Sequence, residues 1–394
     1  MNLISVSPTL EKSNITSPVA AKTHLLVKQI AVLFWEMLLA LPLGLALVEF
    51  HFGGIAWIFG GMAAGTVILQ ICRIFYQYSP KPNRTARKVG MGLVGLTVGA
   101  STAKAHLASV ASGIPVFVLL TLFLILCGGV IGYIYSRLSK TNLLTAMLAT
   151  VPGGVGVMAA IAADYNKNVT LVALVQSLRV TTVVVLISFI ARSSVGNYSY
   201  SQPLPTINNL FTCNPSQLGL LLLVLSATAL VVYFAIKFKI PAGDFFGALL
   251  IGITFNHLLD WLPFVGDISF SPPPLVNIVG QMLLGITIGE YWGEKPAFRK
   301  RTIAYAFLSV GMTLMTGAIA AFLAMQLTNW DWLTCMLVTA PGGSAEMILV
   351  SLTLNHNVEI VTTGHLIRLI AINSSLPIWV FIFRRIDSQL QAEV

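Results

Sequence analysis

The stretch LVTAPGGSAEMILV (337–350) places a Pro-Gly-Gly triplet inside an apolar run that is long enough to enter a membrane. The stretch LATVPGGVGVMAAI (148–161) has nearly the same arrangement earlier in the chain. Proline removes a backbone donor and clashes with the preceding helical turn, and glycine adds conformational freedom, so each run is predicted to break at its triplet. Broken backbone inside a membrane is tolerated only against protein or a water-filled cavity. Each triplet therefore marks a polar position within an apolar segment.

The composition predicts a polytopic integral membrane protein. Of the 394 residues, 56% are hydrophobic and 9% are charged, whereas soluble domains carry roughly 25% charged residues. The lipid bilayer is the expected partner, and we expect a multi-pass protein of the cell inner membrane. The net charge of +9 lies in short clusters between apolar runs, as the positive-inside rule requires, so no nucleic acid partner is expected. The four cysteines lack CxxC spacing, which argues against a disulfide framework or a zinc site.

The charges of the loops predict how often the chain crosses the membrane. Apolar runs lie near 29–49, 54–75, 89–110, 115–136, 142–164, 169–191, 216–236, 242–263, 275–290, 302–326, 333–354 and 358–383. Basic clusters mark the cytoplasmic side at 73–88, 137–140, 237–239, 292–301 and 384–385, and the cation-free loops 193–215 and 328–332 mark the outside. The chain must cross the membrane an odd number of times between the cytoplasmic marker 137–140 and the outside loop 193–215, and again between the outside loop 328–332 and the cytoplasmic marker 384–385. Each of these two stretches contains two apolar runs. The runs that contain Pro-Gly-Gly are therefore predicted to be re-entrant hairpins that enter and leave on one side.

The two halves are copies of one unit. Thr145–Arg179 aligns without gaps with Thr334–Arg368, at a constant offset in the numbering (334 minus 145), and 13 of the 35 positions are identical. Equivalent loops carry opposite charge, so the copies should be inverted relative to each other. The predicted fold is an all-α polytopic membrane protein with two inverted-topology repeats, each of about five transmembrane helices plus a re-entrant Pro-Gly-Gly hairpin. The patterns GLTVG (95–99) and GITIG (285–289) predict close helix packing, or alternatively a helix break that lines the path.

The predicted organisation places both termini in the cytoplasm. Its parts are a disordered cytoplasmic N-terminus (1–28), membrane repeat 1 (29–192), an extracytoplasmic linker (193–215), membrane repeat 2 (216–386) and a cytoplasmic tail (387–394).

Each copy carries a polar pair in the helix that follows its broken run. The pairs are Gln176 with Arg179 and His365 with Arg368, and the i, i+3 spacing places each pair on one helix face. Each arginine lies about ten residues into its helix, about 15 Å of rise and close to mid-membrane. A charged side chain there is usually functional or paired. The pairs therefore predict a shared binding site, and the alternative is a structural ion pair such as Arg368 with Glu346.

The triplets are predicted to complete that site. They expose the N-termini of the following half-helices, whose free N–H groups attract anions. The glycines of the triplets let the backbone approach a ligand or, alternatively, only form the turn. The threonine hydroxyls either face the ligand or bond back to the helix. The predicted substrate-binding residues are Thr150, Gly153, Gly154, Gln176, Arg179, Thr339, Gly342, Gly343, His365 and Arg368.

Two carboxylates without an acidic counterpart in the other copy, Glu346 and Asp164, are candidates for binding a coupling proton or cation. Alternatively, Glu346 stabilises the positive end of a helix and Asp164 lies at the membrane surface. Glu36 is a third carboxylate within an apolar run. The six histidines have no metal-ligand spacing, and no nucleophile motif or phosphate-binding loop occurs, so we expect no metal, no cofactor and no enzyme activity.

The duplicated PGG…M and [QH]xxR pattern resembles the bacterial AbrB-like membrane family, in which one unit occurs twice. The resemblance covers nearly the whole chain after residue 30 and concerns a different family from the soluble DNA-binding regulator of the same name. It implies a transporter, although "ammonia monooxygenase" and "regulator" are also used as labels for members. The sequence lacks the clustered histidines of a copper oxygenase and has no helix-turn-helix region. The plan is also similar to that of glutamate and citrate symporters, which is an analogy of fold and fixes no substrate.

The leading functional hypothesis is a secondary transporter of a small anionic solute, coupled to H⁺ or Na⁺, in which one repeat moves against the other. A membrane-embedded regulator or sensor that affects gene expression is the alternative, and a membrane oxidoreductase is a third. The sequence leaves open the solute, the coupling ion, the direction of transport and a homodimeric state.

Overall fold

The computed structural model describes residues 18–50, 52–77, 82–103, 110, 112–194, 215–238, 240, 242–261, 270–291, 300–354 and 356–392. Within these ranges the chain forms 14 α-helices and one 3-10 turn, η1 (Gly53–Ile55), and no strand. Residues 1–17, 195–214 and 393–394, which include most of the predicted N-terminal segment and linker, lie outside the described residues.

The described helices fall into two groups, the first unit and the second unit, which correspond to the two halves of the chain. The first unit contains α1 (Pro18–Glu49), α2 (Ala56–Phe75), α3 (Arg84–Thr102), α5 (Ile114–Ser139), α6 (Leu143–Thr150), α7 (Val155–Asp164) and α8 (Val169–Ser194). The second contains α10 (Pro215–Lys237), α11 (Gly243–Asp260), α12 (Pro274–Glu290), α13 (Lys300–Leu327), α14 (Trp332–Thr339), α15 (Ser344–Thr353) and α16 (Val358–Ala392). The short helices α6 and α14, and likewise α7 and α15, begin and end at positions that are separated by the same offset as the aligned sequences.

Helix boundaries near the two ends of the chain differ from the predicted ones. Helix α1 begins at Pro18, inside the segment predicted to be a disordered tail, because proline is well suited to the first helical position. Helix α16 continues to Ala392, through most of the segment predicted as the C-terminal tail.

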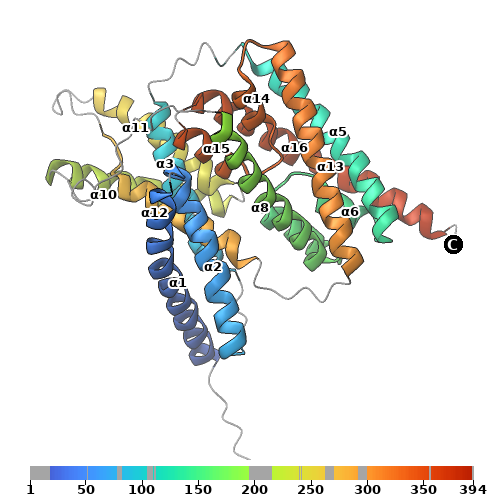
Figure 1. Cartoon of the computed structure of the whole chain (residues 1–394), viewed down its shortest axis with the longest axis horizontal. Coiled ribbons are helices and arrows are strands. Elements are labelled where there is room, and N and C mark those ends of the chain that lie inside the picture. Colours follow the sequence, from blue (N-terminus) through green and yellow to red (C-terminus); the bar gives the residue numbers. More distant parts are fainter. Residues whose placement is uncertain are drawn as a thin grey trace, which may run out of the picture.

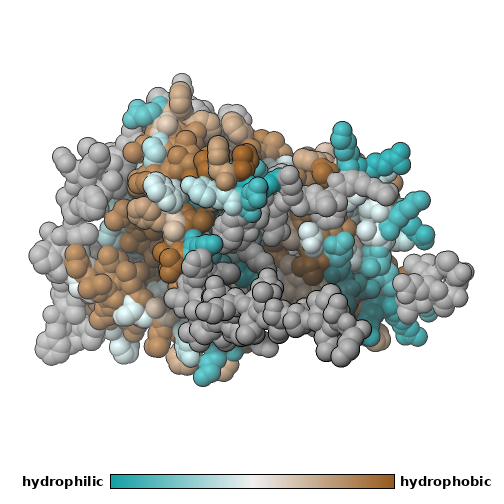
Figure 2. Space-filling view, turned by 90° about the horizontal axis from the view of Figure 1, so that it is seen from below, coloured by the Kyte–Doolittle hydropathy of each residue, from teal (hydrophilic) through white to brown (hydrophobic). Residues whose placement is uncertain are grey.

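The described helices have the lengths and surfaces of a multi-pass membrane protein. Seven of them are long and apolar enough to cross a membrane: Leu26–Glu49, Ala56–Phe75, Ile114–Ser139, Val169–Ile190, Leu218–Lys237, Lys300–Leu327 and Val358–Asp387. On α5, Leu119, Leu122 and Leu126 are each more than half exposed. Figure 2 shows apolar side chains over much of one face, with hydrophilic side chains gathered toward one end. Apolar surface of this extent fits contact with lipid.

The helices are arranged in two bundles, and each bundle contains helices of both units (Figure 1). The glycine-rich bundle consists of α1, α2, α3, α10, α11 and α12, and the hairpin bundle consists of α5 to α8 and α13 to α16. Because α2 packs on α12 and α3 packs on α11, the two units are interleaved. Movement of one repeat as a body against the other would have to break these contacts.

Glycines bring the helices of the glycine-rich bundle into backbone contact, in agreement with the close packing predicted from GLTVG and GITIG. A Cβ atom on any of these glycines would collide with a carbonyl oxygen of the facing helix: Gly285 faces Ile58, Gly289 faces Met62, Gly95 faces Phe245 and Gly99 faces Leu249.

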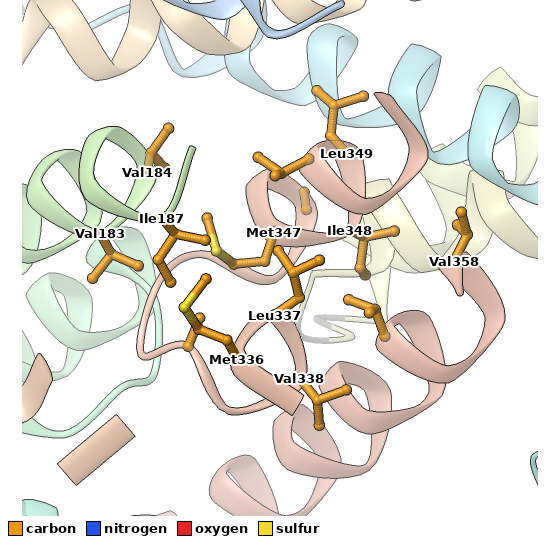
Figure 3. Close-up of a cluster of buried hydrophobic side chains, with 14 of the residues drawn as sticks. Val183, Val184, Ile187, Met336, Leu337, Val338, Met347, Ile348, Leu349 and Val358 are labelled. Atoms are coloured by element: carbon orange, nitrogen blue, oxygen red, sulfur yellow. The ribbon is translucent and has the colours of Figure 1, made fainter. Parts of the chain in front are cut away.

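The helices α14 and α15 belong to the hairpin bundle, and α15 is where this bundle meets the glycine-rich bundle. Their apolar side chains form one buried cluster with Val183, Val184 and Ile187 of α8 (Figure 3). On the other side, α15 packs against α3 and η1, where Thr353 contacts Gly54. This packing places the break between α14 and α15 in the interior of the protein.

Candidate functional site

The helices α6 and α7 form a hairpin whose two ends both contact the last turns of α16. The carboxylate of Asp387 accepts the backbone N–H groups of Leu143 (2.8 Å) and Leu144 (3.1 Å) at the start of α6. One turn earlier on α16, the guanidinium of Arg384 lies 5.7 Å from the ring centroid of Tyr165, which follows α7. The chain therefore reverses at the break, and we call α6 and α7 the first hairpin.

The helices α14 and α15 form the second hairpin, which is closed at its base by Asp331. This residue caps α14 by accepting the backbone N–H of Leu333 (3.1 Å), and it contacts His356 Nε2 (2.7 Å) and Asn357 Nδ2 (3.3 Å) beyond α15. Partial burial raises the pKa of Asp331, but hydrogen bonds from Thr334 and His356 outweigh burial and hold this pKa below its usual value.

The tip of the first hairpin depends on Gly154. Its φ of +84° lies in the left-handed region, and it is the single glycine with positive φ among the described residues. Glycine adopts this conformation without the steric penalty of other residues. Gly153 is packed against Met158 of the same hairpin, so a Cβ there would collide with this side chain. Both glycines of this tip are thus explained by the turn and its packing.

The glycines of the second tip serve close packing. A Cβ on Gly342 would lie 2.9 Å from Cγ1 of Val183 on α8, and a Cβ on Gly343 would collide with the carboxylate of Glu346. Val183 follows Arg179 by one helical turn. The second tip therefore lies against the helix that carries the arginine of the first unit.

The first polar pair holds the broken end of α6. The side-chain amide of Gln176 donates to the carbonyls of Leu148 (2.8 Å) and Val151 (2.9 Å). Arg179 donates from Nη1 to the carbonyl of Thr150 (3.0 Å) and from Nη2 to Oε1 of Gln176 (2.7 Å). These carbonyls have lost their helical partners at the break, so the pair satisfies the groups that proline leaves open.

The second pair has the corresponding role in the second hairpin. His365 Nε2 lies 2.9 Å from the carbonyl oxygen of Leu337, and Arg368 donates from Nη1 to the carbonyl of Ala340 (2.7 Å). Arg368 Nη2 lies 2.6 Å from Nδ1 of His365. In both units, the arginine and its polar partner contact each other and the tip of their own hairpin.

The hydroxyls of the two site threonines bond to main-chain carbonyls at equivalent positions of the two units. Thr150 donates to Ala146 (3.0 Å) and Gly128 (3.5 Å), and Thr339 donates to Cys335 (2.9 Å) and Gly317 (3.0 Å). These hydroxyls therefore bond back to the helix and fasten each hairpin to α5 or α13.

The two arginines form a buried positive centre. Arg179 is 2% exposed and Arg368 is 4% exposed, and Arg368 acts electrostatically on Arg179. Among the described residues, neither forms an ion pair, and Nε of Arg179 has no hydrogen-bond partner. Buried charges are normally paired or bound to a ligand. This centre consequently favours a negatively charged occupant.

Glu346 is not the partner of Arg368. Its carboxylate lies 3.6 Å from the guanidinium of Arg87 on α3, and the side chains of Glu346 and Arg87 are 1% and 23% exposed. This ion pair joins the second hairpin to the glycine-rich bundle. The sequence does not single out Arg87, because this residue lies in a basic cluster whose pattern indicates only the orientation of the chain.

Asp164 lies apart from the first tip. It is exposed at the end of α7, and the ten residues of this helix separate it from the first tip by about 15 Å. Among the described residues, no three His, Cys, Asp or Glu side chains lie close enough together to hold a metal ion.

The chain is similar to a protein family and to curated proteins. The model of the family described as "Transition state regulatory protein AbrB" matches residues 57–384. The chain is 28% identical to "Uncharacterized protein YhjN" of Bacillus subtilis (strain 168), over 82% of this chain and 86% of that protein. It is 25% identical to "Putative regulator AbrB" of Escherichia coli (strain K12), over 86% of this chain and 94% of that protein. The match to the family model covers most of the chain, so this multi-pass membrane protein belongs to the AbrB family.

Proposed function

We propose that the protein is a secondary transporter that moves a small anionic solute, coupled to H⁺ or Na⁺. The observation that supports this most strongly is the pair of buried guanidinium groups, Arg179 and Arg368, at the tips of two broken hairpins. A buried charge without a partner is costly, and a bound carboxylate would offset that cost at both arginines. Each guanidinium has five N–H donors, so donors remain for a ligand after the bonds to the tips.

The proposed placement in the membrane follows from the loop charges. The first hairpin would enter from the cytoplasm and the second from the outside, in two units of inverted orientation within the inner membrane. Broken helices whose tips meet near the midplane are the usual site of substrate in transporters built this way. Both termini would then be cytoplasmic, and the protein would act without a cofactor and without enzyme chemistry.

The proposed movement is of one bundle relative to the other. The hairpin bundle contains both tips and both arginines, and it meets the glycine-rich bundle through α15 and the Arg87–Glu346 ion pair. Opening and closing of this ion pair would accompany each transport step, and Glu346 is well placed to bind the coupling ion while it is separated from Arg87.

Transport is tested with the purified protein in proteoliposomes. We expect a proton or sodium gradient to drive uptake of at least one of labelled acetate, succinate and citrate. Uptake should be lost in Arg179→Met and in Arg368→Met and retained in Arg137→Met, which alters an exposed arginine on α5. No uptake above that of empty liposomes for any of the three, with either gradient, would argue against transport of simple carboxylates.

The second candidate is a membrane-embedded sensor of the same kind of solute. The name of the Escherichia coli relative, "Putative regulator AbrB", favours it. A sensor would bind a carboxylate at the same arginines and show no flux in the liposome assay. An oxidoreductase, the third hypothesis, would instead show an activity that rises and falls with bound copper or iron.

A further inference from the structure

A second buried polar centre lies in the glycine-rich bundle, away from the hairpins. Glu36 is on α1, a helix whose neighbouring residues Phe34 and Trp35 are 61% and 56% exposed. Glu36 itself is 0% exposed. Its side chain therefore points into the seam that α1 forms with α2 and α12, while the adjacent side chains point away from the protein.

The carboxylate of Glu36 has no hydrogen-bond partner. Both of its oxygen atoms are buried and unsatisfied, and Glu36 forms no ion pair among the described residues. A buried carboxylate in this condition is strongly unfavourable as an anion, whereas a protonated carboxyl group has a much smaller desolvation cost.

A second acid interacts with Glu36. Glu290, at the end of α12, is 2% exposed and acts electrostatically on Glu36. One oxygen of Glu290 accepts the backbone N–H of Asn83 (2.8 Å), which supports a negative charge on Glu290. The two acids therefore occupy different environments, and Glu36 is the one without a donor.

Other polar groups also lie at this seam. From α2, the thiol of Cys72 faces Glu36, and the hydroxyl of Thr66 donates to the carbonyls of Met62 (2.9 Å) and Gly289 (3.4 Å). Two carboxylates that interact in a medium of low dielectric constant cannot both be ionised at low cost, and they titrate as a coupled pair.

We propose that Glu36 and Glu290 form a proton-binding site that holds one proton at neutral pH, with the proton on Glu36. A proton is favoured over a metal ion because the described residues provide no group of three metal-ligating side chains in this region. The site goes beyond the proposed transport function and does not depend on it, because neither acid belongs to a hairpin.

Infrared difference spectroscopy of the purified protein in bilayers tests this site directly. A carbonyl stretch of a protonated carboxyl group should be present at neutral pH in sodium-free buffer and shift in D₂O. It should be lost in Glu36→Gln, an isosteric variant that resembles the protonated side chain, and retained in Glu49→Gln, which alters an exposed acid at the end of the same helix.

Three outcomes would overturn the proposal. The first is a wild-type spectrum that lacks this band throughout the neutral range, a result that requires no variant to fold. The second is an unchanged band in Glu36→Gln. The third is loss of the wild-type band when sodium replaces potassium, because the pair would then bind sodium rather than a proton.

Discussion

The ion pair between Arg87 and Glu346 makes an asymmetric prediction about stability. Substitution Arg87→Met leaves a carboxylate that is 1% exposed without its partner. Breaking a buried pair in this way costs about 3–5 kcal/mol. Since Arg87 is 23% exposed and part of the pair is therefore solvated, we expect the lower end, about 3 kcal/mol.

The reverse substitution should cost much less. In Glu346→Gln the arginine that remains can extend its long side chain toward water, so we expect a loss of about 1 kcal/mol. The double variant should also lose about 1 kcal/mol, because no unpaired buried charge is left in it. The coupling between the two sites in the double-mutant cycle is then about 3 kcal/mol.

Reversible unfolding in mixed detergent–lipid micelles, followed by the fluorescence of the seven tryptophans, measures these free energies. Arg84→Met is the matched control, because Arg84 is exposed one turn earlier on α3, and it should change stability by less than about 0.5 kcal/mol. The reasoning fails if Arg87→Met is as stable as the control, or if Glu346→Gln is the more destabilised of the two single variants.

Three further predictions concern the hairpins and the helix contacts. Gly154→Ala should lose about 1–2 kcal/mol because its φ is +84°, whereas Gly156→Ala, with open space around the new methyl group, should be neutral or more stable; equal melting temperatures would contradict this. Gly285→Ala should lose about 1–3 kcal/mol of stability or more because its Cβ would collide with the carbonyl of Ile58, whereas Gly311→Ala, with open space around the new methyl group, should lose none. A stable Gly285→Ala variant would show that α2 and α12 are farther apart. The pKa of Asp331 is lowered in the folded protein, so its contribution to stability should be present above the pKa of an unfolded aspartate, about 3.9, and should disappear as the pH falls through the lower folded value. Asp331→Asn should flatten this part of the plot of stability against pH, and an unchanged plot would refute the assignment.

Much of the fold could be predicted because membrane segments obey strong rules. The apolar runs, the Pro-Gly-Gly breaks and the constant offset between the two copies predict the number and order of the helices, and α6 and α14 show how closely the two units agree. Loop charge, in contrast, cannot show which helices pack together. The interleaved bundles depend on the contacts of Gly285 and Gly95 with the facing helices, which lie far away in the sequence.

The sequence predicts which residues form part of the site, but not which groups they contact. The i, i+3 spacing indicates that Gln176 and Arg179 share a face, but it cannot show that their hydrogen bonds end on the carbonyls of the broken helix. Glu346 and Arg87 lie on different helices and are 259 positions apart in the numbering (346 minus 87). No local pattern distinguishes Arg87 from its basic neighbours.

The claim at the centre of this account is that Arg179 and Arg368 bind one small anion. The most direct measurement is the change in melting temperature of the purified protein on addition of sodium salts of acetate, succinate and citrate, with chloride as the reference. We predict that at least one carboxylate stabilises the wild-type protein and Arg137→Met, and that this stabilisation is lost in both Arg179→Met and Arg368→Met. Equal stabilisation of the wild type and the two variants would contradict the account.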